Sequence, residues 1–217
     1  MVITIDGPVA SGKSSVAKEL ALRFGFNHVN TGLLYRVVAY LSAVHNNNLY
    51  AIPADMRYDF IDDKPIVFWH EVAIDDSFLY SPLIDQEASK ISADARLRAL
   101  LLPIQQALAL THKIIADGRD CGSVVFPQAK VKLFLTAETM VRAQRLMDNQ
   151  DRHYAGMSVE EVAHEIIMRD NNDKNRDVAP LLVPTGAVIV DSTELTFEQT
   201  VEACQAFIQR GLQDQAP

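Results

Sequence analysis

One eight-residue segment limits the folds open to this chain more than any other. Residues 7–14 read Gly-Pro-Val-Ala-Ser-Gly-Lys-Ser, and the apolar run 1–5 leads directly into them. Helix-forming residues follow at 14–21. A G-x-x-x-x-G-K-S pattern between a strand and a helix is typical of a phosphate-binding loop, in which backbone N–H groups and a helix N-terminus face an anion. We therefore expect this loop to bind a nucleoside triphosphate.

Four positions of the loop have a definite physical role. Gly7 and Gly12 allow a close approach and backbone angles that a Cβ would obstruct. Lys13 would reach the β- and γ-phosphates, and the Ser14 hydroxyl would ligate the Mg²⁺ ion that bridges them. The loop alone does not distinguish a kinase from a GTPase, a motor or a switch.

Composition and charge narrow the class of partner. The chain has 217 residues, of which 48% are hydrophobic and 22% charged, as expected for one soluble globular domain. Its net charge of -8 argues against a nucleic acid polymer as the main partner, because binding a polyanion usually needs a basic surface. A small anionic ligand remains possible, since a local arginine cluster can hold it.

Cysteine, histidine and apolar patterns indicate a cytoplasmic protein. Cys121 and Cys204 are far apart in the sequence, and we expect both to be reduced thiols, buried or half-buried. The six histidines have no metal-binding spacing, so each is interpreted as structural or solvent-facing. No apolar stretch approaches the ~20 residues of a membrane span, and the first residues do not resemble a signal peptide.

Short apolar segments alternate with helical ones along most of the chain. Strands are predicted at 2–5, 113–117, 131–136 and 187–191, with a short apolar segment near 28–29, and helices at 13–24, 32–45, 138–149, 158–172 and 196–212. This alternation predicts a parallel sheet with helices on both faces.

The stretch from 54 to 81 interrupts that rhythm. Segments 56–61, 65–70 and 72–74 are separated by acidic turns, which indicates short antiparallel strands inserted into the α/β core. Residues 83–111 are helical by composition, and Pro103 is expected to kink or divide that helix because proline lacks the N–H and clashes with the preceding turn.

Asp117-Gly118-Arg119-Asp120 follows the predicted strand 113–117. Ligands of open parallel sheets bind at the carboxyl ends of the strands, which is also where the phosphate loop lies. A carboxylate there can orient Mg²⁺ or its waters, and Arg119 can hold phosphate as a planar fork. The alternative for Asp117 is a turn-forming residue before glycine.

A second charged cluster runs from 169 to 176. Arg169 and Asp173 are four residues apart and share a helical face, and Arg176 follows about one turn later. Alone, such a run is usually a solvated helix end. Arginines nevertheless gather in the region after strand 131–136, at Arg142, Arg145, Arg152, Arg169 and Arg176. Mobile cations that surround a transferred phosphoryl group would suit a lid.

Taken in order, these segments resemble the bacterial cytidylate kinases, a family of nucleoside monophosphate kinases. The resemblance covers nearly the whole chain. It rests on Ile3-Thr4-Ile5-Asp6-Gly7-Pro8, Ser11-Gly12-Lys13-Ser14, Thr31-Gly32, Tyr35-Arg36, Ala116-Asp117-Gly118-Arg119-Asp120, Gly122, Val124-Val125-Phe126-Pro127, Arg169-Asp170, Asn175-Arg176, Val178-Ala179-Pro180-Leu181 and Asp191-Ser192-Thr193.

The resemblance implies a fold and a reaction. The fold would be that of P-loop NTPases, as a single kinase domain over residues 1–217, with a monophosphate-binding insertion at about 54–81 and a helical lid at about 150–177. The reaction would be reversible transfer of the γ-phosphoryl group from ATP to CMP or dCMP, with Mg²⁺. The family also implies a monomer.

The resemblance further implies a role for individual residues. The ATP side would comprise Gly7, Pro8, Val9, Ala10, Ser11, Gly12, Lys13, Ser14, Ser15 and Arg145, with Ser14 as the metal ligand. The CMP side would comprise Thr31, Tyr35, Arg36, Ser89, Arg98, Asp117, Arg119, Asp120, Arg169, Asp173 and Arg176. Within that set, Arg36, Arg119, Arg169 and Arg176 would bind phosphate, Ser89, Arg98 and Asp120 would read cytosine, and Asp173 would meet the sugar hydroxyls. Catalysis would fall to Lys13, Arg119, Arg169 and Arg176.

This chain departs from the family pattern at a few positions. Ser14-Ser15 follows the loop lysine where Gly-Thr is common, Asn30 stands where an Asp is usual, and Pro103 lies in a helix that usually has no proline. Two other functions remain open: a kinase of another small acceptor such as UMP or AMP, and a non-catalytic protein gated by nucleotide.

Overall fold

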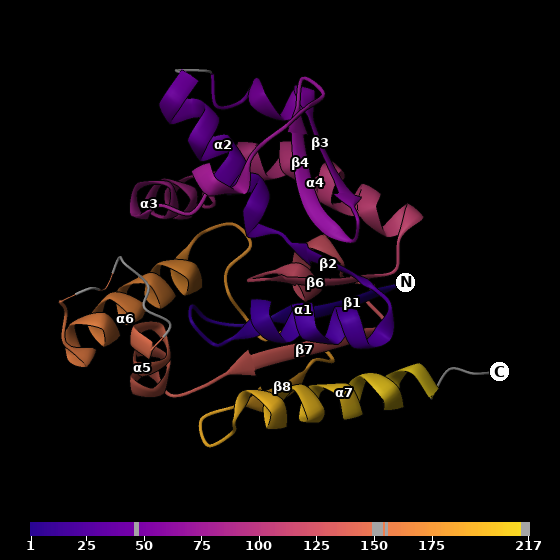
Figure 1. Ribbon diagram of the computed structural model, residues 1–217, viewed down its shortest axis with the longest axis vertical. Helices are drawn as coiled ribbons and strands as arrows, with labels where there is room; N and C mark the ends of the chain where they lie inside the picture. The colour runs from indigo at the N-terminus through magenta and orange to yellow at the C-terminus, as the bar shows by residue number, and fades with distance from the viewer. Residues whose placement is uncertain (46–47, 149–153, 155, 214–217) are drawn as a thin grey trace.

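A five-stranded parallel sheet forms the centre of the molecule (Figure 1). The computed structural model describes residues 1–45, 48–148, 154 and 156–213. The strands are β1 (Val2–Asp6), β2 (Asn27–Asn30), β6 (Ile114–Gly118), β7 (Val131–Thr136) and β8 (Val188–Asp191), in the order β2-β6-β1-β7-β8. All four neighbouring pairs are parallel, which confirms the predicted sheet. Because β1 is central, the loop that follows it opens at the middle of the carboxyl edge.

Helices cover both faces of this sheet. On one face, α1 (Lys13–Phe24) and α7 (Phe197–Gln213) pack against Ile3, Ile5 and Leu133. On the other, α2 (Gly32–His45) and α4 (Ala95–Thr111) form a second core with strand residues of β2 and β6. Each fully buried aliphatic side chain contributes about 1.5–3 kcal/mol, so the two cores fix the sheet edge from both sides.

The inserted segment forms a second sheet, which is small and antiparallel, as predicted. Its strands are β3 (Met56–Ile61), β4 (Lys64–Trp69) and β5 (Val72–Ala73), flanked by 3₁₀ turns η1 (Ile52–Asp55) and η2 (Asp76–Phe78). Asp62 and Asp63 both have positive φ, as a two-residue hairpin turn of type I′ requires. Trp69 packs against the same core as α2 and α4.

The helical stretch after this sheet divides at a different point from the predicted one. The helices are α3 (Pro82–Ile91) and α4, so the break lies at 92–94 and α4 continues through Pro103. Asp94 caps α4 by accepting a hydrogen bond from the Leu97 N–H at 2.8 Å. Pro103 and Ala99 are both exposed, so water can hydrate the Ala99 carbonyl that loses its helical donor.

Helices α5 (Thr139–Asp148) and α6 (Val159–Asn175) pack against each other beside the carboxyl edge (Figure 1). The capping box of Ser158 and Glu161 starts α6, as expected, and α6 runs three residues further than predicted. Arg152 and the first part of the predicted lid lie outside the described residues, as do 46 and 47 of the predicted turn. No helix in the described part of the chain is long and apolar enough to span a membrane.

Candidate active site

The loop after β1 has the backbone of an anion cradle. A Cβ on Gly7 would lie 2.1 Å from the Leu135 carbonyl oxygen, so only glycine fits where the loop crosses β7. Gly12 has φ of 85°, in the left-handed region that glycine adopts without strain. Lys13 follows as the first residue of α1, and its Nζ donates to the Pro8 carbonyl at 3.0 Å. The ammonium thus folds back over the loop.

Lys13 is an unusual lysine electrostatically. Burial and the nearby charge of Arg119 lower its pKa to about 7, against the opposing effect of Asp117. A polyphosphate bound in the loop would supply the missing negative charge and favour the ammonium form. The environment of Lys13 therefore favours binding of an anion to the loop.

The Ser14 hydroxyl is held by a buried carboxylate. Ser14 Oγ donates to Asp117 Oδ2 at 2.6 Å, and His28 Nε2 lies 2.6 Å from Asp117 Oδ1. Burial opposes ionisation of Asp117, but hydrogen bonding and charge from His28, with Lys13 and Ser14, hold its pKa below the usual range. Asp117 is therefore a paired carboxylate beside the phosphate loop, and the interpretation as a mere turn residue is wrong.

A second buried carboxylate ties the loop to α6. Asp170 accepts from the Val9 N–H at 3.0 Å and from Arg142 Nη1 at 2.7 Å. Arg142 Nη1 also donates to the Val9 carbonyl at 2.8 Å. Arg142 is only 5% exposed, so its assignment to a set of mobile lid cations is wrong: it is a fixed structural tie between α5, α6 and the loop.

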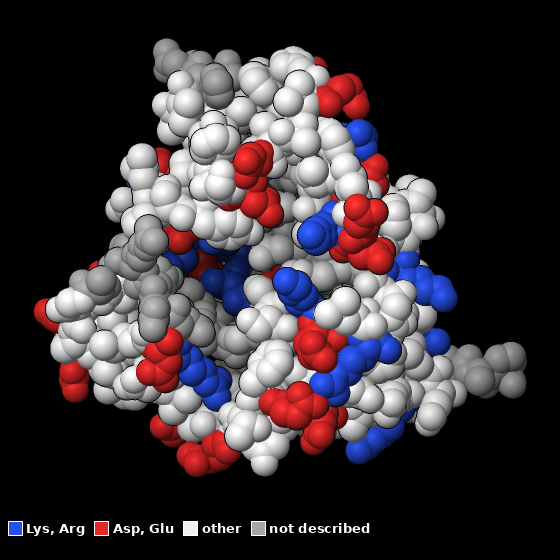
Figure 2. All heavy atoms as spheres, viewed as in Figure 1, with Lys and Arg blue, Asp and Glu red and all other residues white. Residues whose placement is uncertain are grey.

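A cavity of about 310 Å³ opens beside the loop. Figure 2 shows a hollow in this part of the surface with Lys and Arg side chains in its depth. All the residues predicted for the CMP side line this cavity: Thr31, Tyr35, Arg36, Ser89, Arg98, Asp117, Arg119, Asp120, Arg169, Asp173 and Arg176. The break between α3 and α4 is what brings Ser89 and Arg98 to one cavity, although they are nine residues apart.

Ion pairs fix the orientation of charged side chains that line this cavity. Asp120 is buried and pairs with Arg98 through one oxygen, while its other oxygen lies 3.5 Å from Arg176 Nη2. Arg119 Nε donates to Asp173 Oδ2 at 2.7 Å. The guanidinium groups are thus oriented before any ligand arrives, which lowers the entropy cost of binding one.

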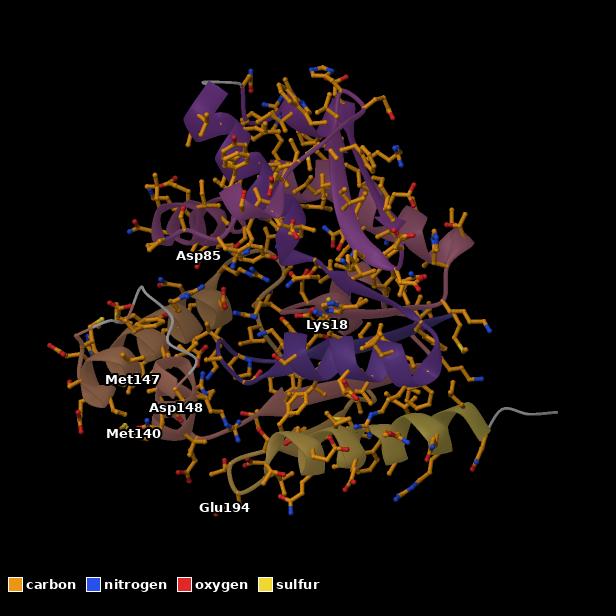
Figure 3. The ribbon with its side chains drawn as sticks, in the orientation of Figure 1. Lys18, Asp85, Met140, Met147, Asp148 and Glu194 are labelled. Atoms are coloured by element: carbon orange, nitrogen blue, oxygen red, sulfur yellow. The ribbon has the colours of Figure 1, made fainter. Side chains whose placement is uncertain are left out.

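Arg36 has an acidic partner that the sequence did not reveal. Its Nη1 contacts Asp85 Oδ1, and both side chains are partly exposed at the cavity. In Figure 3, Asp85 lies on the side of α3 that faces α6 across the opening. Burial and the charges of Arg169 and Arg119 lower the pKa of Arg36, so the group stands among other cations.

A second cavity, of about 590 Å³, lies on the other side of the loop. Among the residues predicted for the ATP side, Ala10, Ser11, Gly12, Lys13, Ser14, Ser15 and Arg145 line it. Gly7 and Pro8 do not line it, and Val9 lines the first cavity instead. Arg145 is fixed by donating to the carbonyls of Ser192, at 2.6 Å, and Leu195, at 3.2 Å.

The two cavities meet at the start of α1. Lys13 and Ser14 line both of them, together with Leu146. A ligand in the second cavity and a ligand in the first can therefore approach each other at the lysine and hydroxyl of the loop. This arrangement fits transfer of a group between two bound molecules.

Most of the chain matches one protein family in sequence. A family model described as Cytidylate kinase matches residues 3–210. The chain belongs to the cytidylate kinase family. It is 38% identical over 212 residues to the cytidylate kinase of Chlamydia muridarum, covering 93% of this chain and 95% of the relative. It is 36% identical over 203 residues to that of Mycoplasmoides gallisepticum, covering 92% and 89%.

Among solved structures, this chain is similar in fold to a shikimate kinase from Bacteroides thetaiotaomicron. The TM-score is 0.54 at 14% sequence identity, over 96% of this chain and 98% of the other. At this identity the likeness concerns the fold, a P-loop kinase fold with a parallel sheet between helices. The predicted fold class is thereby confirmed.

Sequence reasoning missed three features of this cytidylate kinase family site. His28 contacts Asp117, so its assignment to structural or solvent-facing histidines was incomplete. Asp85 faces Arg36, and the wall of the second cavity is completed by Ser192, Leu195, Thr196, Phe197 and Thr200. The capping box predicted at Thr196 and Gln199 is present and could have indicated the start of that wall.

Proposed function

We propose that this chain catalyses reversible transfer of the γ-phosphoryl group from ATP to CMP or dCMP. The observation that carries the proposal is the meeting of two cavities at Lys13 and Ser14. The second cavity would hold ATP with its phosphates along the loop, and the first would hold the monophosphate. Phosphoryl transfer needs no protein nucleophile, only alignment and positive charge around the transferred group.

Arginines around the first cavity suit the phosphates of the acceptor and the transferred group. Arg36, Arg119 and Arg169 line it, with Arg176 at the Asp120 end. We assign these four guanidinium groups, with Lys13, to holding phosphate and stabilising the charge that develops during transfer. Asp173, paired with Arg119, is assigned to the sugar hydroxyls.

Asp120 and Arg98 suit the base of the acceptor. Cytosine presents an amino donor next to a ring nitrogen and a carbonyl, which both accept. The buried Asp120 carboxylate would accept from the amino group, while Arg98 and the Ser89 hydroxyl would donate to the acceptors. Uracil would bring a carbonyl oxygen against the same carboxylate, which leaves two acceptors facing each other.

The loop region fits Mg²⁺ by the chemistry of its donors. Ser14 Oγ and the Asp117 carboxylate are hard oxygen groups 2.6 Å apart, and Mg²⁺ in kinases is held by few protein oxygens together with phosphates and water. Ser14 would ligate the ion and Asp117 would hold the hydroxyl or an ion-bound water. Bound Mg²⁺ would neutralise charge on the β- and γ-phosphates.

On this proposal, residues 54–81 are the monophosphate-binding insertion and residues 150–177 the lid of a single domain. The small sheet β3-β4-β5 and α6, which carries Arg169 and Asp173, support the two assignments. The cytoplasmic location and the monomeric state remain predictions.

A panel of acceptors tests the function. Purified protein with ATP and Mg²⁺ is given CMP, dCMP, UMP or AMP, and the diphosphate formed is measured by chromatography. We expect CMP and dCMP to be phosphorylated in clear preference to UMP and AMP. Phosphorylation of AMP with none of CMP would indicate a kinase of another acceptor. Tight ATP binding with no transfer to any of the four would indicate a nucleotide-gated protein.

A further inference from the structure

We propose that His28 is a positioning residue: its imidazole orients the Asp117 carboxylate, which in turn orients the Ser14 hydroxyl toward the metal-bound triphosphate. The inference rests on the part of the proposed function that puts Mg²⁺ and ATP at the loop. It does not depend on which acceptor is used.

The geometry is a continuous chain of three side chains. His28 Nε2 is 2.6 Å from one oxygen of Asp117, and Ser14 Oγ is 2.6 Å from the other. The Asp117 side chain is 2% exposed, so these neighbours, and not bulk water, set its orientation. The short distance on each side leaves the carboxylate little freedom to rotate.

The sheet explains how His28 reaches this carboxylate. Strands β2 and β6 are parallel neighbours, and Asn30 pairs in register with Asp117. His28 lies two residues before Asn30 and therefore on the same face of β2. Its side chain is 13% exposed, so the imidazole is packed at the sheet edge and held in reach of Asp117.

Fixing the carboxylate has a consequence for the hydroxyl. Ser14 has one hydroxyl proton, and it is donated to Asp117. The lone pairs of Ser14 Oγ are then directed away from Asp117 and are free to accept a cation. Lys13 also attracts the Asp117 carboxylate. His28 holds Oδ1 of Asp117 in place. The other oxygen, Oδ2, therefore stays hydrogen-bonded to Ser14, and the carboxylate does not rotate toward Lys13.

The competing explanation is that His28 merely fills space at the sheet edge. The two explanations differ in what a substitution should change. A packing defect would weaken nucleotide binding with or without metal, or lower stability alone. Loss of orientation at Ser14 should weaken binding of the metal-bound nucleotide selectively, because partners that orient metal ligands typically contribute about 10–100-fold in metal affinity or activity.

Two amide variants separate the hydrogen bond from the packing. In His28→Gln the side-chain amide nitrogen can occupy the position of Nε2 and donate to Asp117. In His28→Asn the amide is one methylene shorter and falls short. His28→Leu removes the donor altogether. His70→Asn is the matched control, because His70 also faces a carboxylate, Asp55, but at 3.7 Å and away from both cavities. Asn also tolerates the positive φ of that position.

The measurement is calorimetric titration with the non-hydrolysable ATP analogue AMP-PNP, once with excess Mg²⁺ and once with EDTA. We expect His28→Asn and His28→Leu to lose about 10–100-fold in affinity for the Mg²⁺ complex and less than about 2-fold without metal. His28→Gln and His70→Asn should stay within about 3-fold of the parent in both titrations. In steady-state assays, the first two variants should lower kcat while the KM for CMP stays unchanged.

Three results would overturn the inference. Parent-like affinity of His28→Asn for the Mg²⁺ complex would remove any positioning role. Equal weakening with and without metal would point to packing, as would Gln behaving no better than Asn. If the Leu variant fails to fold, the Gln and Asn pair decides alone. A parent protein that binds Mg²⁺ and AMP-PNP but does not phosphorylate CMP would reject the proposed function while leaving the test of His28 intact.

Discussion

The charged form of Lys13 is disfavoured in the free protein and should be stabilised by a bound anion. Burial and Arg119 lower its pKa to about 7 in the free protein. A bound triphosphate favours the ammonium and raises that pKa, so binding should take up protons at any pH between the two values. At about pH 8 the uptake should approach one proton per nucleotide, and at about pH 6 it should be small because Lys13 is already charged.

Calorimetry of ATP binding in two buffers of different ionisation enthalpy measures this uptake. Lys13→Met should abolish it. An uptake at about pH 8 that persists in Lys13→Met would assign the proton to another group.

Asp120 should govern the choice of base. Asp120→Asn turns one acceptor into a donor, so the amino group of cytosine loses its partner while the carbonyl of uracil gains one. We expect kcat/KM for CMP to fall about 10²-fold or more. The ratio of kcat/KM for CMP to kcat/KM for UMP should therefore decrease. Parallel kinetics on CMP and UMP provide the measurement. Circular dichroism is needed beside it, because Asp120 also pairs with the buried Arg98. An unchanged ratio between the two substrates would mean that Asp120 does not read the base.

Asp85 should weaken binding of the acceptor nucleotide. It neutralises Arg36 at the cavity in the free protein, and an incoming phosphate must either displace the carboxylate or remain close to it. Partly exposed pairs of this kind contribute up to about 1 kcal/mol, so Asp85→Asn should lower the KM for CMP about 3- to 5-fold without changing kcat. Glu87→Gln is the control, because it removes the same charge from α3 outside the cavity. A rise in KM would show instead that Asp85 orients Arg36 or contacts the substrate.

At the scale of elements, α6 connects the two halves of the site. Its Asp170 holds the phosphate loop through Val9 and Arg142, while the adjacent Arg169 lines the first cavity. Because the Asp170–Arg142 pair is nearly inaccessible to solvent, removing one partner leaves a buried, unpaired charge.

Asp170→Ala should therefore lower the free energy of unfolding by about 3–5 kcal/mol. Asp173→Ala is the matched control on the same helix. Its pair with Arg119 is more open to solvent, so the loss should be about 1 kcal/mol or less. Urea denaturation followed by circular dichroism compares the two. Equal losses would show that the tie to the loop adds nothing to stability.

The order of elements was predictable because local signals agreed with the fold. The glycines of the loop, the alternation of apolar and helical segments and the capping box at Ser158 all have short-range causes. The break at 92–94 was missed because Pro103 is the stronger sequence signal, although exposure makes it tolerable and the Asp94 cap was the better guide. His28 and Asp85 could not be found from spacing, since their partners are 89 and 49 residues away.

At the scale of the whole molecule, the net charge of the chain is opposite in sign to the cations that line the first cavity. The chain carries a net charge of -8, whereas Lys13 and several arginines line the first cavity. Attraction to the cavity cations should dominate the binding of a small anion, because the distant surface charges are largely screened.

The KM for CMP should consequently rise with salt as the Debye length shrinks from about 10 Å at 0.1 M to about 3 Å at 1 M ionic strength. Initial rates in a series of KCl concentrations at fixed, saturating MgATP measure the trend. If the overall negative charge controlled access, screening would relieve repulsion and the KM would fall.

The tie from Val9 through Asp170 to Arg142 also constrains protein engineering. Two neighbouring residues of α6 have different contacts: Arg169 lines the first cavity, whereas Asp170 holds the phosphate loop. A chimera that receives α6 from a kinase with a different acceptor would therefore import new loop contacts together with the new arginines. Such a graft would have to carry α5 with it, so that the arginine and the aspartate arrive as a matched pair. In this chain, the residues proposed to select the acceptor cannot be exchanged independently of the phosphate loop.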